Sequence, residues 1–350
     1  MSSVKLKLPL GGSKTISAPD SASDETITLP AGNQTVATQS QVNGLGGRKN
    51  LIINGGFDVW QRGTSFTATS VYSADRWKAQ FGGNQGTVAQ ETTSLPSGSR
   101  YGLKMTATAT DASGWSQMGQ QIEYKNFYQA VGQTVTISFY GKAHNTNSGS
   151  TNITVRTRTN TTEDTSTIFS GAGTTTAVTL TTSWVKYTVT RTIPSDSKAW
   201  SIEFVMGAFT NGDGYTISQV QLELGSVATD FEHRSYGEEL ALCQRYYQRY
   251  GGSPYVGIAS GSVFNVTTKS TFFMSFTTTM RASPSATFAD LISTDRATFD
   301  AVITTLSGST TGTTGAYFYC GHAAAGSAWH PSGLAVKSTT SGYLALDAEL

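Results

Sequence analysis

The sequence has few charged residues for its length. Only 13% of its 350 residues are charged, against ~25% in an ordinary globular protein. With 24 basic and 23 acidic residues the formal net charge is +1, and like charges do not form runs. Such a surface offers no electrostatic attraction to a phosphate backbone or an anionic membrane. We therefore expect no nucleic-acid binding.

Long apolar runs and cysteines are also scarce. The first residues alternate apolar and polar side chains and reach Gly11 and Gly12 before an apolar signal core develops. No stretch approaches the ~20 apolar residues of a membrane-spanning helix. We expect a protein made in soluble form, without classical export and without membrane insertion. Cys243 and Cys320 are too few for a disulfide scaffold, so we interpret both as buried thiols; whether they pair stays open.

Apolar residues are present in ordinary amount, and most of them alternate with Ser, Thr, Asn and Gln. Strict alternation turns one side of a strand inward and the other toward water. Residues 48–232 therefore predict the walls of a β-sandwich. The clearest strands are residues 135–140, 152–156, 185–189 and 201–205. Turn residues at 211–214 predict that residues 204–206 and 215–220 form neighbouring antiparallel strands.

One helix interrupts the strands, within a linking segment of residues 233–252. Ser235 and Glu238 have the spacing of a capping box, which starts a helix. The helical face that follows consists of Leu240, Cys243, Tyr247 and Tyr250, with Tyr246 beside it and Gly251 and Gly252 after it. We expect this aromatic face to pack between two domains or two subunits.

Both ends of the chain also carry β patterns. Residues 253–350 predict a second, smaller β-sandwich domain, with an unpatterned Ser/Thr/Gly loop at 307–315. Residues 1–47 hold strands too short and too polar to make a core, and residues 43–47 indicate a hinge. We expect an arm that docks on other proteins or intertwines with copies of the chain; a disordered tail is the alternative.

Four sequence blocks resemble tail-fibre and other structural proteins of tailed-bacteriophage virions. They are NLIINGGFDVWQRG at residues 50–63, ADRW at 74–77, QLELGSVATDFEHR at 221–234 and EELALCQRYY at 238–247. The resemblance implies a virion protein, made in the bacterial cytoplasm, that forms homotrimers and joins other virion proteins through its N-terminal arm. Its implied function is a tail fibre or receptor-binding protein, which would contact host-surface polysaccharide through many weak sites.

Two other functions stay open. A head-decoration, head-fibre or other structural virion protein could have the same fold without binding sugar, because fold does not determine function. An accessory module of a secreted polysaccharide-degrading enzyme is disfavoured by the expected lack of an export signal.

Residues 48–232 also resemble a carbohydrate-binding-module jelly roll. The matching blocks are Asn-x-Gly-Phe at residues 54–57, GQTVTISFYGKA at 132–143, SWVKY at 183–187 and ISQVQLE at 217–223. Combined with the strand patterns, this resemblance predicts an all-β protein. It has a jelly-roll β-sandwich and a second smaller β-domain, joined by one short α-helix, with an extended N-terminal arm.

The same resemblance raises the question of a structural calcium ion, which related modules hold with acids from the first and last strands. Asp58 stands near the first position, but Ser218 and Gln219 stand where the last strand usually offers an acid. This weakens a site for a cation that needs several oxygen ligands. We therefore expect no cofactor.

The segment GWSQMGQQIEY at residues 114–124 is the candidate carbohydrate site. Aromatic faces stack on the C–H surfaces of sugar rings, and amides bridge neighbouring hydroxyls. By its place in the jelly roll the segment offers Trp115, Gln117 and Gln120 as contacts; alternatively, Trp115 covers a sandwich edge and the amides are solvated. Trp329, in a loop of small residues of the distal domain, is a second candidate. We expect Trp60, Trp77 and Trp184 to pack in the core.

The sequence gives little support for catalysis. It contains no Gly-x-Ser-x-Gly nucleophile elbow, and the spacing of Cys320, His322 and His330 matches no standard zinc site. A pair of carboxylates would suffice for glycoside hydrolysis, but their separation is a tertiary property. The available acids are Glu123, Glu163, Asp164 and Glu203. We expect a protein that is not an enzyme.

Overall fold

The computed structural model describes most of the chain. The described residues are 3–7, 13–17, 49–67, 70–82, 85–144, 152–165, 169, 173–264, 268–295, 300–322, 330–338 and 342–350, with the backbone alone at 3–7, 13–17 and 307–310. The chain divides into two compact units, Met1–Gly47 and Arg48–Leu350. In the first, β1 (Ser3–Lys7) pairs antiparallel with β2 (Ser13–Ser17). The other strands predicted in the arm, and the hinge at 43–47, lie outside the described residues.

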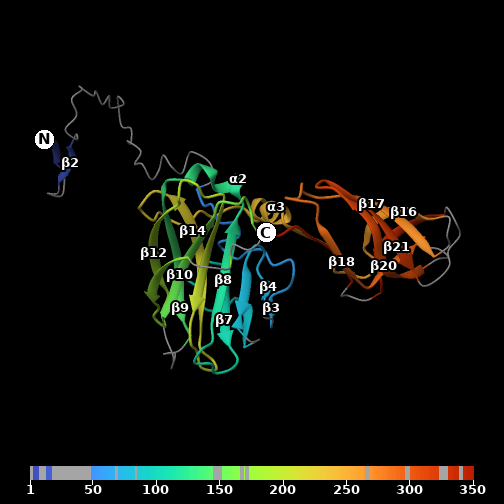
Figure 1. The fold of residues 1–350 in the computed structure, drawn as a ribbon, viewed down its shortest axis with the longest axis horizontal. Helices are drawn as coiled ribbons and strands as arrows, with labels where there is room; N and C mark the ends of the chain where they lie inside the picture. The colour runs from blue at the N-terminus through green and yellow to red at the C-terminus, as the bar shows by residue number, and fades with distance from the viewer. Residues whose placement is uncertain are drawn as a thin grey trace. The chain divides into compact units, whose positions relative to one another are not determined.

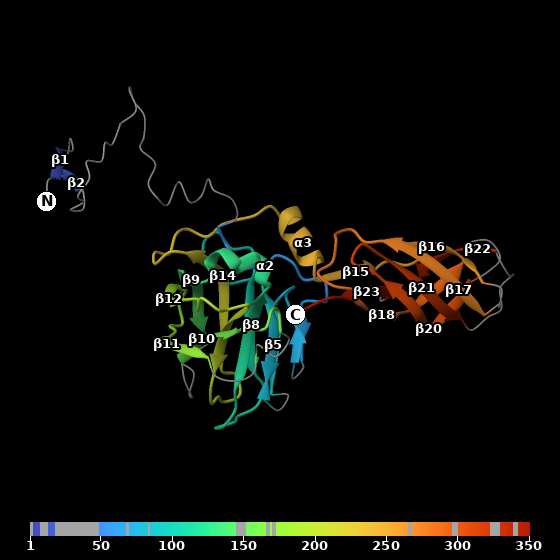
Figure 2. The same cartoon turned by 45° about the horizontal axis from the view of Figure 1, so that its top comes forward.

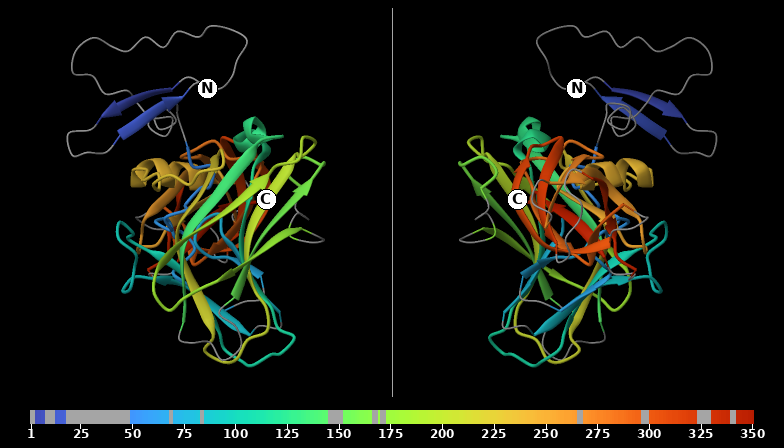
Figure 3. Two further views of the ribbon diagram at one scale, coloured as in Figure 1. Left: turned by 90° about the vertical axis from the view of Figure 1, so that its left-hand side faces the viewer. Right: turned by 90° about the vertical axis from the view of Figure 1, so that its right-hand side faces the viewer.

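The second unit begins with a sandwich of two six-stranded antiparallel sheets (Figure 1). One sheet contains, in spatial order, β11 (Thr174–Thr179), β10 (Asn152–Asn160), β13 (Ala199–Met206), β8 (Ser116–Ile122), β5 (Lys78–Phe81) and β4 (Ser70–Tyr72). The other contains β12 (Val185–Thr192), β9 (Thr134–Ala143), β14 (Gly214–Leu224), β7 (Gly102–Ala107), β6 (Gly86–Glu91) and β3 (Ser65–Phe66). A short helix α2 (Tyr124–Phe127) and a 3-10 turn η2 (Tyr128–Ala130) lie at one end of the sandwich (Figure 3).

The core lies between these sheets, as the alternating pattern predicts. Phe139 of β9 and Phe204 of β13 are fully buried and meet edge to face across the sandwich, with ring centroids 4.8 Å apart. Trp77 is fully buried beside them, whereas Trp60 is half-buried against the core. Trp184 lies outside the core, so its predicted core packing is wrong: its Nε1 donates to the Ser94 carbonyl at 3.0 Å.

The chain passes from one sheet to the other after β13, which corrects the predicted pairing of residues 204–206 with 215–220. β13 and β14 belong to opposite sheets, and β14 pairs with β7 and β9. In the turn, Thr210 N donates to Asp213 Oδ2 at 2.8 Å, and Gly212 adopts a φ of +90°. Turn residues predict a chain reversal, but they do not encode which sheet receives the next strand.

The linking helix α3 (Tyr236–Gln244) is shorter than predicted. Its capping box is confirmed, since Glu238 N donates to Ser235 Oγ at 3.3 Å and Ser235 N donates to Glu238 Oε2 at 3.0 Å. The predicted helical positions Tyr247 and Tyr250 instead belong to β15 (Tyr247–Gly251), which pairs with β23 (Tyr343–Asp347). The helix prediction fails at these two residues because their pairing partner, β23, lies near the C-terminus, and local spacing cannot reveal so distant a contact.

The remaining strands form the distal part of the unit (Figure 2). β15, β23 and β18 (Ser285–Ala289) make a three-stranded sheet. A closed barrel contains, in order, β16 (Gly257–Val263), β17 (Lys269–Ser275), β21 (Gly315–His322), β20 (Asp300–Thr311), β19 (Leu291–Thr294) and β22 (Pro331–Val336). The predicted distal sandwich is therefore a barrel, because β22 pairs with both β16 and β19 and closes the sheet. Much of the predicted loop at 307–315 is strand.

A small third cluster joins helix α3 to the sandwich and to the C-terminus. It consists of Ile53, Val59, Cys243, Tyr246 and Leu350. Tyr246, which was predicted beside the helical face, follows the end of α3 and is fully buried in this cluster. Both cysteines are buried free thiols. Within the described residues, no helix is both long enough and apolar enough to span a bilayer.

The all-β fold class is thus confirmed: a jelly-roll sandwich and a smaller β-domain, with a short helix between them.

Candidate carbohydrate-binding groove

Strand β8 lies inside its sheet, between β13 and β5, and presents alternate side chains to opposite faces. Met118 and Ile122 point into the hydrophobic core. Gln117 and Gln121, at odd positions, belong to the outer face of the sheet. Gln120 shares the inner face with the apolar residues, where its amide bonds both backbone groups of Ile53, at 2.9 and 2.7 Å.

A groove of about 390 Å³ opens on the outer face. Its lining residues are Gln80, Trp115, Gln117, Arg156, Arg158, Phe169 and Val205; we call it the sandwich groove. Trp115, just before β8, keeps 42% of its surface exposed. Its indole lies against Gly82, where an added Cβ would stand 3.0 Å from Trp115 Nε1. The indole thus packs against the backbone of Gly82 while much of the side chain stays open to solvent.

A chain of polar contacts fixes the amides of the groove. The register sets Gln117 beside Gln80 on β5 and beside Val205 on β13. Gln117 Nε2 donates to Gln80 Oε1, and Arg156 Nη2 donates to Gln117 Oε1. Because each group is held by the next, these side chains are preorganised, which lowers the entropy cost of binding.

Glu203 holds in place the two arginines that line one side of the groove. It is fully buried and sits between two arginines. Arg156 Nε lies 2.8 Å from its Oε2, and Arg158 Nε lies 2.9 Å from its Oε1. Ser201 Oγ also donates to Oε1, at 3.1 Å. A buried carboxylate paired in this way positions the guanidinium groups, and both of its oxygens are occupied.

Phe169 closes the other side of the groove. Its ring lies so close to Gly119 that an added Cβ there would meet the ring at 2.8 Å. The Lys78 ammonium lies 5.6 Å from the same ring, within cation–π range. Gln121 Nε2 donates to the Thr165 carbonyl at 3.1 Å, which ties this segment down over the sheet.

The structure treats the four predicted site residues differently. Trp115 and Gln117 line the groove together. Gln120 does not, because residues 117 and 120 of one strand must face opposite sides of the sheet. Trp329 lies outside the described residues.

Five residues of the groove were missed by sequence reasoning: Gln80, Arg156, Arg158, Phe169 and Val205. For Arg156 and Val205 a signal was available, since both lie in strands that the sequence predicts. Strand order was needed to bring them beside β8.

The calcium positions implied by the jelly-roll resemblance do not fit a cation. Gln219 Nε2 donates to the Ser97 carbonyl at 2.9 Å, and Ser218 Oγ donates to the Tyr101 carbonyl at 2.8 Å. Donor groups thus occupy the carbonyl oxygens that could otherwise serve as ligands. Burial, with Glu239 nearby, raises the pKa of Asp58. Among the described residues, no three His, Cys, Asp or Glu side chains gather in a way that could hold a metal.

Comparisons with known proteins find distant likenesses of fold. No protein-family model matches the chain, and no curated protein sequence matches it. The enzymatically active domain of tailspike protein 4 of bacteriophage CBA120 is 13% identical, with a TM-score of 0.35; the match covers 50% of this chain and 21% of that one.

Two sugar-related structures are similar over the same share of the chain. A putative sugar-binding protein from Bacteroides thetaiotaomicron VPI-5482 is 17% identical, with a TM-score of 0.34, over 51% of this chain and 100% of that one. The CBM22-1 xylan-binding domain of Paenibacillus barcinonensis Xyn10C is 16% identical, with a TM-score of 0.32, over 51% and 96%. At these TM-scores the likenesses assign neither a ligand nor an activity to the chain.

Proposed function

We propose that the protein is a non-catalytic bacteriophage virion protein, a tail fibre or receptor-binding protein, that binds host-surface polysaccharide through the sandwich groove. The observation that carries the proposal is the exposed indole of Trp115 beside the preorganised amides of Gln117 and Gln80. An aromatic face stacks on a sugar ring while neighbouring amides bond its hydroxyls. The virion assignment rests on the fibre-like sequence blocks.

The contacts of Glu203 and Glu123, the two candidate acids that are almost fully buried, support a binding role over a catalytic one. A glycosidase needs one carboxyl group that can give up a proton and a second that is free to attack or to activate water. Both oxygens of Glu203 are held by arginines. Both oxygens of Glu123 are held by Arg245, and Tyr246 also bonds one of them. Hydrogen bonds from Arg245 and Tyr246 outweigh burial and lower the pKa of Glu123, so it stays ionised.

Binding at a shallow groove of this size is weak per site, and repeated copies raise the avidity through effective concentration. We therefore expect a homotrimer, which joins other virion proteins through the N-terminal arm. Light scattering of the full chain should then give about three times 37.1 kDa; a stable monomer would remove the multivalent part of the proposal.

The first prediction tests the groove on an array of bacterial surface polysaccharides and neutral oligosaccharides. Trp115→Ala should weaken binding about ten-fold or more, because it removes the stacking face. Tyr128→Ala is the matched control, since Tyr128 is an equally exposed aromatic, 53% accessible, that does not line the groove. Equal loss in both variants would contradict the groove as the site.

A wild-type protein that binds no glycan would favour the second candidate, a head-decoration or other structural virion protein. Immunogold labelling of intact particles separates the two, because it places the protein at the tail tip or on the head.

A further inference from the structure

The outer face of the distal barrel carries exposed aromatic rings that the sandwich groove does not use. Phe273 of β17 is 63% exposed, and its ring centroid lies 4.2 Å from that of Tyr317 on β21, at 64°. The Tyr317 ring lies 4.8 Å from Tyr319, at 74°. We call these three residues the distal aromatic strip. Edge-to-face contacts restrict the rings, so Phe273 is held in one orientation while its surface stays in solvent.

Hydroxyl side chains flank the strip. The register sets Ser260 of β16 opposite Phe273, and Thr271 of β17 opposite Tyr319. Residues paired across a ladder share one face of the sheet, so both hydroxyls belong to the same face as the rings. Ser260 is exposed there, whereas Thr271 is buried beneath the surface. None of these four paired residues is charged. The strip is therefore an aromatic surface with a neutral, hydroxyl-bearing border.

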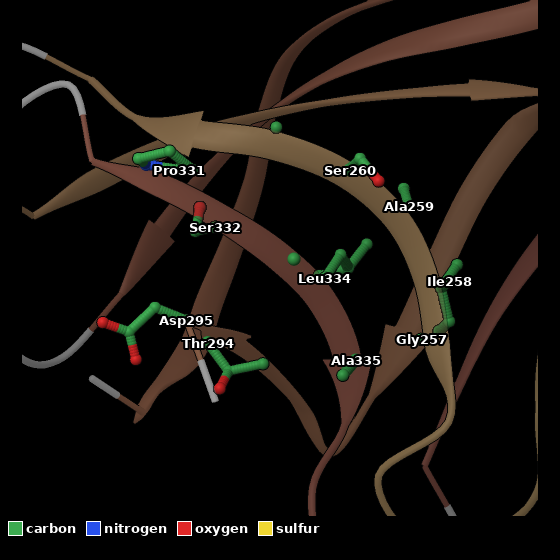
Figure 4. A pocket seen from close by; sticks show the side chains of 12 residues that line it. Gly257, Ile258, Ala259, Ser260, Thr294, Asp295, Pro331, Ser332, Leu334 and Ala335 are labelled. Atoms are coloured by element: carbon green, nitrogen blue, oxygen red, sulfur yellow. The ribbon is translucent and has the colours of Figure 1, made fainter. Parts of the chain in front are cut away.

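A hollow of about 570 Å³ adjoins the strip on the other side of Ser260 (Figure 4). Its walls are residues 257–261 of β16 and 331–335 of β22, with Thr294 and Asp295 at the end of β19. Gly333 lines the hollow and is paired with Ser260 on one side and with Thr294 on the other. A Cβ added to Gly333 would meet its nearest neighbours at 3.7 Å, an ordinary contact, so the fold itself does not need glycine here. The missing side chain keeps the hollow open.

The hollow and Phe273, the ring of the strip nearest to it, form one row across four neighbouring strands, β19, β22, β16 and β17. At ~4.8 Å between strands, the row follows the curved barrel wall for about 14 Å, which suits several linked sugars better than a single sugar. Asp295 lies at one end of the row; its side chain is 8% exposed, and His330 Nδ1 lies 3.7 Å away. Phe273 supplies a stacking face at the other end.

We propose that this row is a second carbohydrate site, separate from the sandwich groove, that takes a segment of neutral polysaccharide. One sugar ring stacks on Phe273, and the next residues of the glycan follow the hollow over Gly333 toward Asp295. This inference extends the proposed function to a second surface, and it does not require that the sandwich groove bind.

The chemistry of the row favours this ligand over two others. A stable protein interface buries ~1,200 Å² or more around an apolar centre, whereas here three rings are bordered by hydroxyls. The Asp295 carboxylate would repel an acidic polysaccharide. A neutral glycan matches both the aromatic faces and the hydroxyl groups.

The second prediction is tested by affinity electrophoresis of the full chain in native gels that contain galactan, xylan or dextran, or acidic alginate. Each variant is made in the wild-type chain and in the Trp115→Ala chain, so that the two surfaces are measured separately. Phe273→Ala removes the stacking face, and Gly333→Thr places a side chain in the hollow, where its Cβ meets only ordinary contacts. Each should weaken retardation by a neutral polysaccharide about five- to ten-fold. Val302→Ala, an exposed position on β20 of the same barrel, should leave retardation unchanged.

Each outcome separates this inference from the proposed function. If Trp115→Ala abolishes all retardation and the barrel variants change nothing, the inference is overturned and the sandwich groove stands. If retardation survives Trp115→Ala but is lost with Phe273→Ala, the inference stands and the groove fails. A wild-type chain retarded by no neutral polysaccharide overturns this inference, whereas the polysaccharide array decides on the sandwich groove. Stronger retardation in alginate, or a change in oligomeric state with Phe273→Ala, also overturns the neutral-glycan assignment.

Discussion

His144 is a titratable side chain that the fold keeps neutral. It follows β9, and its Nε2 lies 2.9 Å from Thr216 Oγ1. Burial, reinforced by the charges of Lys104 and Lys142, lowers the pKa of His144 from 6.5 to about 4. On acidification the unfolded chain therefore takes up the proton first. The stabilising contribution of neutral His144 is complete above about pH 6.5 and is lost as the pH falls toward 4.

The third prediction concerns the pH dependence of stability that His144 causes. His144→Gln keeps a polar partner for Thr216 but cannot titrate. Between pH 7 and pH 4 the wild-type free energy of unfolding should therefore fall by up to about 3 kcal/mol more than that of the variant. Urea unfolding at several pH values measures the difference. Parallel pH profiles of the two proteins would show that His144 does not contribute.

Which of the predicted site residues line one groove depends on the alternation of side chains along β8, and the other lining residues depend on tertiary contacts. Trp115 and Gln117 stand two positions apart, so their side chains lie on the same side of the sheet, and both line the groove. Gln120 is three positions from Gln117, so its side chain points to the inner face, where its amide hydrogen-bonds to the backbone of Ile53. The alternation of side chains along a strand would by itself have excluded Gln120 from the groove. Arg156 could not be added from the sequence, because its place beside Gln117 depends on two intervening strand pairings.

Among the elements, helix α3 holds the segment at residues 50–59 to the rest of the chain. Asn54 N donates to Glu239 Oε1, and the same carboxylate pairs with Arg234 at 3.2 Å. A nine-residue helix is marginal by itself in water. Its stability comes from these contacts, from the burial of Cys243 and from its N-terminal cap.

The fourth prediction concerns that cap. Ser235→Ala removes the oxygen that accepts from Glu238 N, and it should lower the free energy of unfolding by about 1 kcal/mol. Ser235→Asn, which retains a capping oxygen, should stay within a few tenths of the wild type. Urea unfolding of the three proteins measures the effect. A full loss with asparagine as well would show that the serine acts through something other than the cap.

At the scale of the whole molecule, the sandwich and the C-terminus are joined by buried arginines. Arg76 is fully buried: its Nη2 donates to the Gln121 carbonyl at 2.7 Å, its guanidinium lies 3.6 Å from the Tyr246 ring, and Nη1 pairs with Glu349. Arg62 also pairs with Glu349, at 3.2 Å. Both arginines belong to the fibre-like blocks, so these blocks build the junction rather than the groove.

The fifth prediction tests this junction. Glu349→Gln leaves Arg76 as a buried cation without its carboxylate and should cost about 3–5 kcal/mol of stability. Asp347→Asn is the matched control, because that carboxylate also pairs with Arg62 but is 41% exposed, and its loss should cost less than about 1 kcal/mol. Thermal unfolding by calorimetry compares the two. Equal, small losses would show that the junction does not depend on the Arg76 pair.

The sequence by itself determined the all-β class, the alternating faces of the central strands and the start of α3. Each of these depends on contacts within a few residues, such as side-chain alternation along a strand or a cap within one helical turn. Tertiary structure decided the closure of the distal barrel, the end of α3 at Gln244 and the row from Asp295 to Phe273. These features depend on which distant strands pair, and pairing is selected by the burial of the whole core rather than by any local pattern.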